Sequence, residues 1–266
     1  MTGARILHAQ LHLLDRQVVR ARDGRQVCKA DDLELKHDAE GRPYVSAILA
    51  GPLALGPRIG GVPGRLIVAV TELFRPEEDP APRRVDMAQV SGIDAALSVD
   101  GDPEEPALER WTRRNLIAPI PGSGAGEDTA APPGPAGVRA EEGATRISEI
   151  IGRPVSDATG TPMGQVADVQ LTQDGPLLRG VQHAFRVSGL IVAPRHTGQL
   201  FGYERGPGGQ APLLVRMIVR RLHRGSRYVT WDQVASLGTP PAPIRLSVPA
   251  AETAPLTELY ERDPAT

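Results

Sequence analysis

Internal repetition is the feature of this sequence that most constrains its fold. Three blocks from the first part of the chain recur in the second part in the same order: residues 14–21 as 151–158, residues 24–35 as 160–171, and residues 85–93 as 229–237. Both parts then close on a short apolar segment, at 96–99 and 244–248. A repeat of roughly 100 residues is far longer than a solenoid unit. We therefore predict a tandem duplication of one small domain.

Within each copy, the local pattern is mainly that of strands and turns. In the first copy, residues 18–21 are short and β-branched, residues 22–24 have turn composition, and residues 33–35 alternate. A second turn at Glu40-Gly41 leads into the apolar run 44–49. Several short strands with glycine-rich turns at close spacing predict a small β-barrel or sandwich.

One segment in each copy has helical spacing instead. Residues 65–75 place Leu66, Ile67, Val70, Leu73 and Phe74 on one face. The second copy repeats this pattern in residues 212–224, with Leu214, Val215, Ile218, Val219 and Leu222. We therefore expect one short helix before the last strands of each barrel.

Composition shifts divide the chain into four parts. The stretch from 101 to 144 begins with an acidic patch and a short amphipathic run and then becomes mostly Pro, Gly, Ala and Ser, which is typical of a disordered linker. The predicted parts are a first barrel (1–100), a short helix with flexible linker (101–144), a second barrel (145–249) and an acidic tail (250–266).

Cysteine content and hydropathy exclude several classes of protein. Cys28 is the only cysteine, so the chain is neither a disulfide scaffold nor a cysteine-based zinc protein. No apolar run approaches the 18 residues of a membrane span. The first residues are interrupted by His8, Gln10 and His12, unlike a signal peptide. We expect a cytoplasmic protein, with a peripheral position at a membrane as a further option.

The formal net charge of -2 hides an asymmetry between the parts. Residues 145–249 carry 12 Arg and Lys against 6 Asp and Glu, a balance of +6. The linker and the tail are both acidic. This asymmetry points to a partner for the second copy.

The repeated motifs resemble those of the PRC-barrel domain family. They are the openings 14–19 and 151–156, the turns at Gly24 and Gly160, the pairs Asp32-Leu33 and Asp168-Val169, and the closings 87–90 and 231–234. The second copy is the closer match, and the first departs from it at Asp15, Cys28 and Met87. The resemblance implies a small β-barrel that serves as an interaction module without catalytic chemistry or a cofactor. Members of the family include the cytoplasmic part of a photosynthetic reaction-centre subunit and the C-terminal domain of a ribosome maturation factor.

The helix predicted at 212–224 provides the main candidate site. Four of its basic side chains fall on one arc and a fifth lies beside it: Arg216, Arg220, His223 and Arg224, with Arg221 adjacent. Three of the matching positions in the first copy are not basic, so the fold does not require these charges. The arc is a candidate contact for an acidic protein surface, an anionic membrane or RNA phosphates. The alternative is a solvated basic face.

Four matched charged residues have two interpretations. Asp32 and Asp168 occupy equivalent places, as do Arg16 and Arg153. They could form an acid–base pair in each copy, or the carboxylates could cap turn amides while the arginines hold strand ends. We favour the structural interpretation, because a shared fold alone would produce the match.

The remaining candidates point away from catalysis. His8 and His12 have a metal-ligand spacing, but segment 6–14 lacks a His-Glu-x-x-His pattern and is expected to be a strand with surface histidines. Cys28 is expected to be an inert thiol. We predict no catalytic residue, no metal and no cofactor.

The sequence therefore predicts a non-enzymatic adaptor or scaffold. Its expected partner is an unidentified protein or membrane-associated complex, contacted partly through the basic helix. An RNA- or ribosome-assembly factor that uses the same basic face is the alternative. A small-molecule or metal-dependent enzyme ranks third, because no motif indicates a polar pocket.

Overall fold

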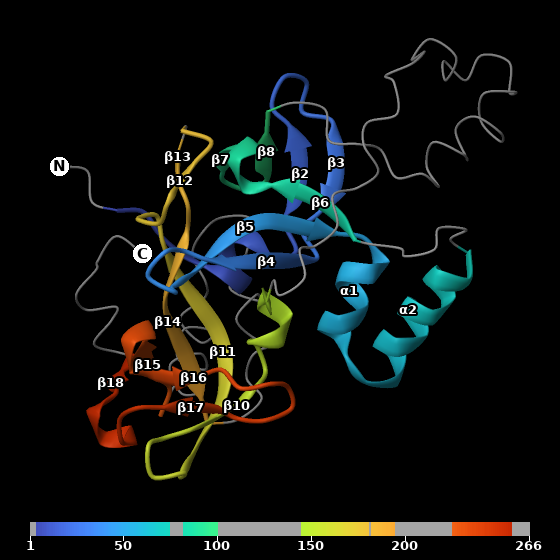
Figure 1. The fold of residues 1–266 in the computed structure, drawn as a ribbon. Helices are drawn as coiled ribbons and strands as arrows, with labels where there is room; N and C mark the ends of the chain where they lie inside the picture. Colours follow the sequence, from blue (N-terminus) through green and yellow to red (C-terminus); the bar gives the residue numbers. More distant parts are fainter. Residues whose placement is uncertain (1–3, 75–81, 101–144, 181, 195–224, 257–266) are drawn as a thin grey trace, which may run out of the picture.

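The computed structural model describes residues 4–74, 82–100, 145–180, 182–194 and 225–256, with the side chains of 72–74 excepted. This part of the protein is mainly β, as predicted, and its largest sheet is strongly curled (Figure 1). Within it, no helix is both long enough and apolar enough to cross a bilayer. The predicted linker and the predicted basic helix lie outside the described residues.

The first half places a helical hairpin between its fifth and sixth strands. Its elements are β1 (Ile6–His8), the π-helix η1 (Ala9–Leu13), β2 (Gln17–Arg20), β3 (Gln26–Lys29), β4 (Asp32–His37), β5 (Pro43–Ala50), α1 (Pro52–Ile59), α2 (Gly61–Phe74), β6 (Arg83–Asp86), the short helix η2 (Met87–Gln89), β7 (Val90–Ile93) and β8 (Leu97–Val99). The turn between β4 and β5 is local in origin. The Asp38 carboxylate accepts the backbone N–H groups of Glu40 and Arg42, and Gly41 has a φ of 75°.

The second half includes β11, the longest strand among the described residues. Its elements are β9 (Thr145–Arg146), η4 (Ile147–Glu149), β10 (Pro154–Ser156), β11 (Pro162–Thr172), β12 (Leu177–Leu178), β13 (Gln182–His183), β14 (Arg186–Ala193), β15 (Arg227–Thr230), η5 (Trp231–Gln233), β16 (Val234–Ser236), β17 (Ile244–Leu246), η6 (Ala250–Glu252) and β18 (Ala254–Pro255).

The two halves have the same pattern of strand pairing. In the first half β2 is antiparallel to β3 and parallel to β8, and in the second half β10 is antiparallel to β11 and parallel to β17. The order β4-β5-β6 corresponds to β11-β14-β15, and the pair β7-β8 corresponds to β16-β17. The matched blocks of sequence therefore occupy matching places in the fold.

The opening strand of each half pairs with the other half. β1 is antiparallel to β11, with Leu7 opposite Leu171, and β9 is antiparallel to β4, with Thr145 opposite Leu35. Each half thus contributes a strand to the sheet of its neighbour. Neither half completes its own sheet without the other.

A shared sheet and a shared core also join the halves. β5 and β14 meet at Tyr44 and Arg186, and the N–H of Val45 donates to the carbonyl of Phe185 at 2.8 Å. This contact makes one 12-stranded sheet from strands of both halves, among the described residues. The core cluster draws side chains from both halves and is almost entirely aliphatic, as expected of a chain with 3 Phe and 2 Trp.

The structure differs from the sequence-based expectations in three segments. The predicted strand 6–14 is wrong beyond His8, because residues 9–13 form η1. The predicted helix 65–75 lies within α2, except for Arg75, which is outside the described residues; α2 begins earlier and is preceded by α1, which we did not predict. Residues 250–256, assigned to the tail, contain η6 and β18, which pairs with β15. The finer prediction of two barrels in tandem stays a prediction.

Candidate interaction surface

The structure does not place the basic residues proposed as the contact site. Arg216, Arg220, Arg221, His223 and Arg224 all lie outside the described residues. Their role therefore stays a prediction. The other candidate residues from the sequence lie within the described part of the chain.

The two matched aspartates join the halves. Asp32 accepts hydrogen bonds from the backbone N–H of Ser148 at 3.1 Å and from its hydroxyl at 2.5 Å. Asp168 accepts the backbone N–H of Gln10 at 2.8 Å and that of Val169 at 2.7 Å. Burial raises the pKa of both carboxyls, that of Asp168 to about 7. The carboxylates hold the turns that open the opposite half, in line with the structural interpretation.

The two matched arginines hold the turns that precede β8 and β17. The Arg153 guanidinium donates to the carbonyls of Leu237, Gly238 and Ala242. Arg16 donates to the carbonyl of Ala95 at 2.8 Å. These described hydrogen bonds join arginine to backbone rather than to the matched aspartate. These contacts are those of a structural clamp, as the structural interpretation expects.

The two histidines form a local pair. The backbone N–H of His8 donates to Nδ1 of His12 at 2.8 Å, and the ring centroids are 5.9 Å apart. His8 is only 4% exposed, so the prediction of a surface position was wrong for this residue. Burial, followed by the charge of His12, lowers the pKa of His8 to about 4. In the described part of the chain, no group of three potential ligands could hold a metal ion.

A buried polar cluster lies on β4, β5 and β6 of the first half. Glu34 Oε1 accepts hydrogen bonds from the Ser46 hydroxyl at 2.6 Å and from Arg84 Nε and Nη2 at 3.1 and 3.0 Å. Glu34 has no exposed surface. A buried carboxylate needs a partner of opposite charge, and Arg84 is that partner.

The same place in the second half holds a neutral cluster. Gln170 Oε1 accepts the Tyr228 hydroxyl at 2.6 Å and the Ser188 hydroxyl at 3.2 Å. The strand registers make Gln170 equivalent to Glu34, and Tyr228 equivalent to Arg84. The two clusters have one geometry with different charge, which indicates a role in packing.

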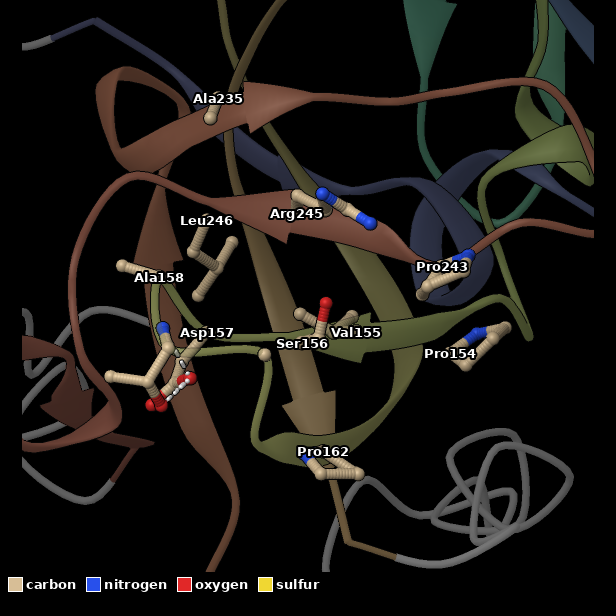
Figure 2. A pocket seen from close by; sticks show the side chains of 12 residues that line it. Pro154, Val155, Ser156, Asp157, Ala158, Pro162, Ala235, Pro243, Arg245 and Leu246 are labelled. Carbon is tan, nitrogen blue, oxygen red and sulfur yellow. Dashed lines mark hydrogen bonds between the residues drawn. The ribbon is translucent and has the colours of Figure 1, made fainter.

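A shallow pocket of 660 Å³ lies along β10 and β17 (Figure 2). Its polar lining includes Ser156, Thr159 and Arg245. The Asp157 carboxylate at its edge is occupied by the N–H groups of Thr159 and Thr161 and by the Thr159 hydroxyl. These hydrogen bonds, the Thr159 hydroxyl first, lower the pKa of Asp157. The pocket presents one cation and one further hydroxyl, a set too small to define a reaction.

The α1–α2 hairpin stands at an edge of the molecule, with α2 on the side away from the sheet (Figure 1). α1 contacts β4, β5 and η4, whereas α2 packs mainly on α1. Arg58 anchors α1 to the rest of the first half, because its guanidinium donates to Asp15 Oδ2 at 2.5 Å and to the carbonyl of Asp31 at 3.2 Å. Asp31 also accepts the N–H of Gly51 at 2.7 Å, just before α1 begins. The sheet therefore holds α1, and α1 carries α2.

Glycines set the close approach of these two helices. A Cβ on Gly64 would lie 2.2 Å from the carbonyl oxygen of Gly56, so a side chain at position 64 would force the helices apart. The connection at Gly60 and Gly61 has positive φ at both residues, 65° and 60°. The hairpin thus depends on glycine at its turn and at its crossing point.

A row of apolar side chains on the hairpin is exposed. Ile59, Val62, Leu66 and Val70 are 50%, 79%, 62% and 44% exposed. Val62, Leu66 and Val70 are four residues apart on α2 and therefore lie along one side of it, and Ile59 ends α1 just before the turn. We call these four residues the apolar row. A helix normally turns such a stripe toward a core, and a continuous exposed stripe marks an interaction site.

The sequence predicts that Leu66 and Val70 lie on an apolar helix face, but it does not indicate that this face is exposed as an interaction surface. The signal was present in composition. From Gly51 to Val70 the chain holds only Gly, Pro and aliphatic residues apart from Arg58 and Arg65. A surface helix of a monomer ordinarily carries more polar residues than this.

The fold and this surface together define a mainly β protein with a projecting apolar hairpin. No protein-family model matches the chain, and no curated protein matches it. The residues themselves therefore carry the evidence for a function.

Proposed function

We propose that this protein is a non-catalytic adaptor that attaches to a membrane-associated complex through the α1–α2 hairpin. Two PRC-like barrels, one from each half, would form its scaffold, with a cytoplasmic position at the membrane periphery. The basic arc predicted at 212–224 would supply a second contact. The observation that carries the proposal is the apolar row, exposed on a hairpin that the sheet holds in place.

The described contacts of the other candidates support this proposal. The matched aspartates hold the two halves together, and the matched arginines hold a turn within their own half. The polar clusters are buried and internally hydrogen bonded. The apolar row, in contrast, is a set of exposed aliphatic side chains on one element.

The test is the distribution of the tagged full-length chain in native lysate, separated on a density gradient. We expect the wild-type chain to sediment with a membrane-associated complex. The variant Val62→Ser/Leu66→Ser/Val70→Ser should shift to the fraction of free protein, because the row no longer offers apolar area. Leu177→Ser is the matched control, since Leu177 on β12 is 54% exposed and lies outside the hairpin.

Two further arms decide between partner classes. Detergent should release the wild-type chain, whereas nuclease should not. Release by nuclease, together with loss of binding in Arg216→Glu/Arg220→Glu/Arg224→Glu, would instead support the RNA-associated alternative. If the hairpin variant and the wild-type chain sediment identically, the adaptor proposal in this form is wrong.

A further inference from the structure

We infer that the apolar row inserts into the surface of an anionic lipid bilayer, with α2 lying along the boundary between headgroups and acyl chains. This inference rests on the proposed function and names the partner of the hairpin. It concerns a surface distinct from the basic arc predicted from the sequence.

The chemistry of the exposed side chains favours lipid over protein. The apolar row is entirely aliphatic, and from Gly51 to Val70 Arg58 and Arg65 carry the only polar side chains. A protein interface normally combines an apolar centre, rich in aromatic residues, with a rim that forms about one hydrogen bond per 100–200 Å². This hairpin has little with which to form such a rim. Acyl chains require none.

The turn of the hairpin satisfies some of its own backbone groups. The N–H of Gly60 donates to the carbonyl of Gly56 at 3.0 Å, and the N–H of Gly64 donates to the carbonyl of Gly60 at 3.1 Å. Two backbone hydrogen bonds therefore close the turn between the helices. In lipid, each unsatisfied backbone group is costly, so an exposed segment must satisfy its own groups.

The charges of the hairpin are those that anionic headgroups attract. Arg58 and Arg65 are both positive, and Glu72 near the end of α2 is the one carboxylate in the sequence of the hairpin, which is therefore net positive. Arg65 is exposed and precedes Leu66 of the apolar row. When Leu66 is inserted among the acyl chains, the long side chain of Arg65 can extend its guanidinium to the headgroups. Arg58 forms an ion pair with Asp15, so we assign the larger electrostatic contribution to lipid binding to Arg65.

The shape of the hairpin fits a shallow insertion. The apolar row runs along α2 rather than gathering at one end, and α2 has 14 residues. A helix with an exposed apolar face can lie in the plane of the interface with that face buried about 5–10 Å deep. Because α2 stands away from the sheet (Figure 1), the strands would remain in water.

The test uses purified full-length protein and flotation with two kinds of vesicle: phosphatidylcholine alone, and phosphatidylcholine with phosphatidylglycerol. We expect binding to both, and stronger binding to the anionic vesicles. Val62→Ser/Leu66→Ser/Val70→Ser should lower the bound fraction about tenfold or more on both, since each burial of an aliphatic side chain is lost. Arg65→Glu should weaken binding mainly to the anionic vesicles. Leu177→Ser should bind as the wild-type chain does.

A second readout locates the insertion. In a Cys28→Ser background, a polarity-sensitive fluorophore on Val62→Cys should shift to the blue when vesicles are added. The same fluorophore on Leu177→Cys should not shift. A response at position 177 equal to that at position 62 would overturn the inference.

The two proposals fail in different ways. If purified wild-type protein binds neither vesicle while the hairpin variant still loses its complex in lysate, the lipid inference is wrong and the adaptor proposal stands with a protein partner. If vesicle binding is present but insensitive to the hairpin variant, the lipid inference is also wrong, because another surface then binds.

Discussion

The carboxylate of Asp168 accepts a hydrogen bond from the backbone N–H of Gln10, 2.8 Å away, across a separation of 158 residues in sequence. Asp32 makes the reciprocal contact with Ser148. Each aspartate lies on a long strand of one half and holds the segment that opens the other half. The contacts therefore act where the halves exchange strands.

Removing the carboxylate of Asp168 should destabilise the whole protein. Asp168→Ala leaves the N–H groups of Gln10, Leu11 and Val169 without their acceptor in a buried place. We expect a loss of about 1–3 kcal/mol in the free energy of unfolding, measured with urea. Asp232→Ala is the control, because this carboxylate is 71% exposed and should cost less than about 0.5 kcal/mol. A loss in Asp168→Ala no larger than in the control would contradict a role in joining the halves.

The raised pKa of Asp168 predicts the direction of a pH effect. The folded protein binds a proton at this carboxyl up to about pH 7, whereas the unfolded chain releases it near its ordinary value of 3.8. This group therefore adds stability at low pH, and that contribution falls as the pH rises from about 4 to 7. Asp168→Asn should remove the dependence and should be more stable than the wild-type protein above pH 7. Urea unfolding at a series of pH values measures the difference between the two curves.

His8 should act in the opposite direction over part of the same range. Its pKa is lowered from 6.5 to about 4, so the unfolded chain takes up a proton first as the pH falls. Stability from this group is present above pH 6.5 and is lost between about 6.5 and 4. His8→Gln should remove this loss, so that its curve lies progressively above that of the wild-type protein, by a few kcal/mol at most. Parallel curves for the two proteins would show that His8 does not titrate in this way.

The two polar clusters predict which substitutions the first half will accept. Arg84→Ala leaves the Glu34 charge buried without its partner, and we expect a loss of about 3–5 kcal/mol in the free energy of unfolding. Glu34→Gln/Arg84→Tyr reproduces the residues of the second half and should cost less than Arg84→Ala alone. If the double variant is less stable than Arg84→Ala, the neutral residues of the second half cannot replace the charged pair of the first half, and this prediction is wrong.

The crossing of α1 and α2 predicts an unusual cost for alanine. Replacing glycine by alanine within a helix ordinarily gains about 1 kcal/mol. Gly64→Ala should instead loosen the hairpin, because the new Cβ would meet the carbonyl of Gly56. Hydrogen–deuterium exchange of residues 52–71 should become faster in Gly64→Ala. Ala69→Gly, on the exposed side of α2, reports the effect of helix propensity alone and should give the smaller change.

The sequence predicted the fold class and many of the local elements because their signals are local. Alternation and turn glycines marked the strands of the first half, and the spacing of Leu66 and Val70 marked a helix that the structure contains. The π-helix at 9–13 was missed because it carries no comparable pattern and is held by Asp168, which is distant in sequence.

Long-range contacts decided the rest. Repeated blocks in the sequence indicated two like units, but periodicity carries no information on which strand pairs with which half. Only the tertiary structure places β1 on β11 and β9 on β4.

The candidate surface shows the same division. The sequence by itself determined that residues 51–70 are aliphatic and hold two arginines as their polar side chains. It could not determine that the row from Ile59 to Val70 faces outward, because an apolar stripe looks the same in sequence whether it packs on a core or not. The glycine contact between the helices and the anchoring of Arg58 on Asp15 fix that orientation, and both depend on residues brought together by folding.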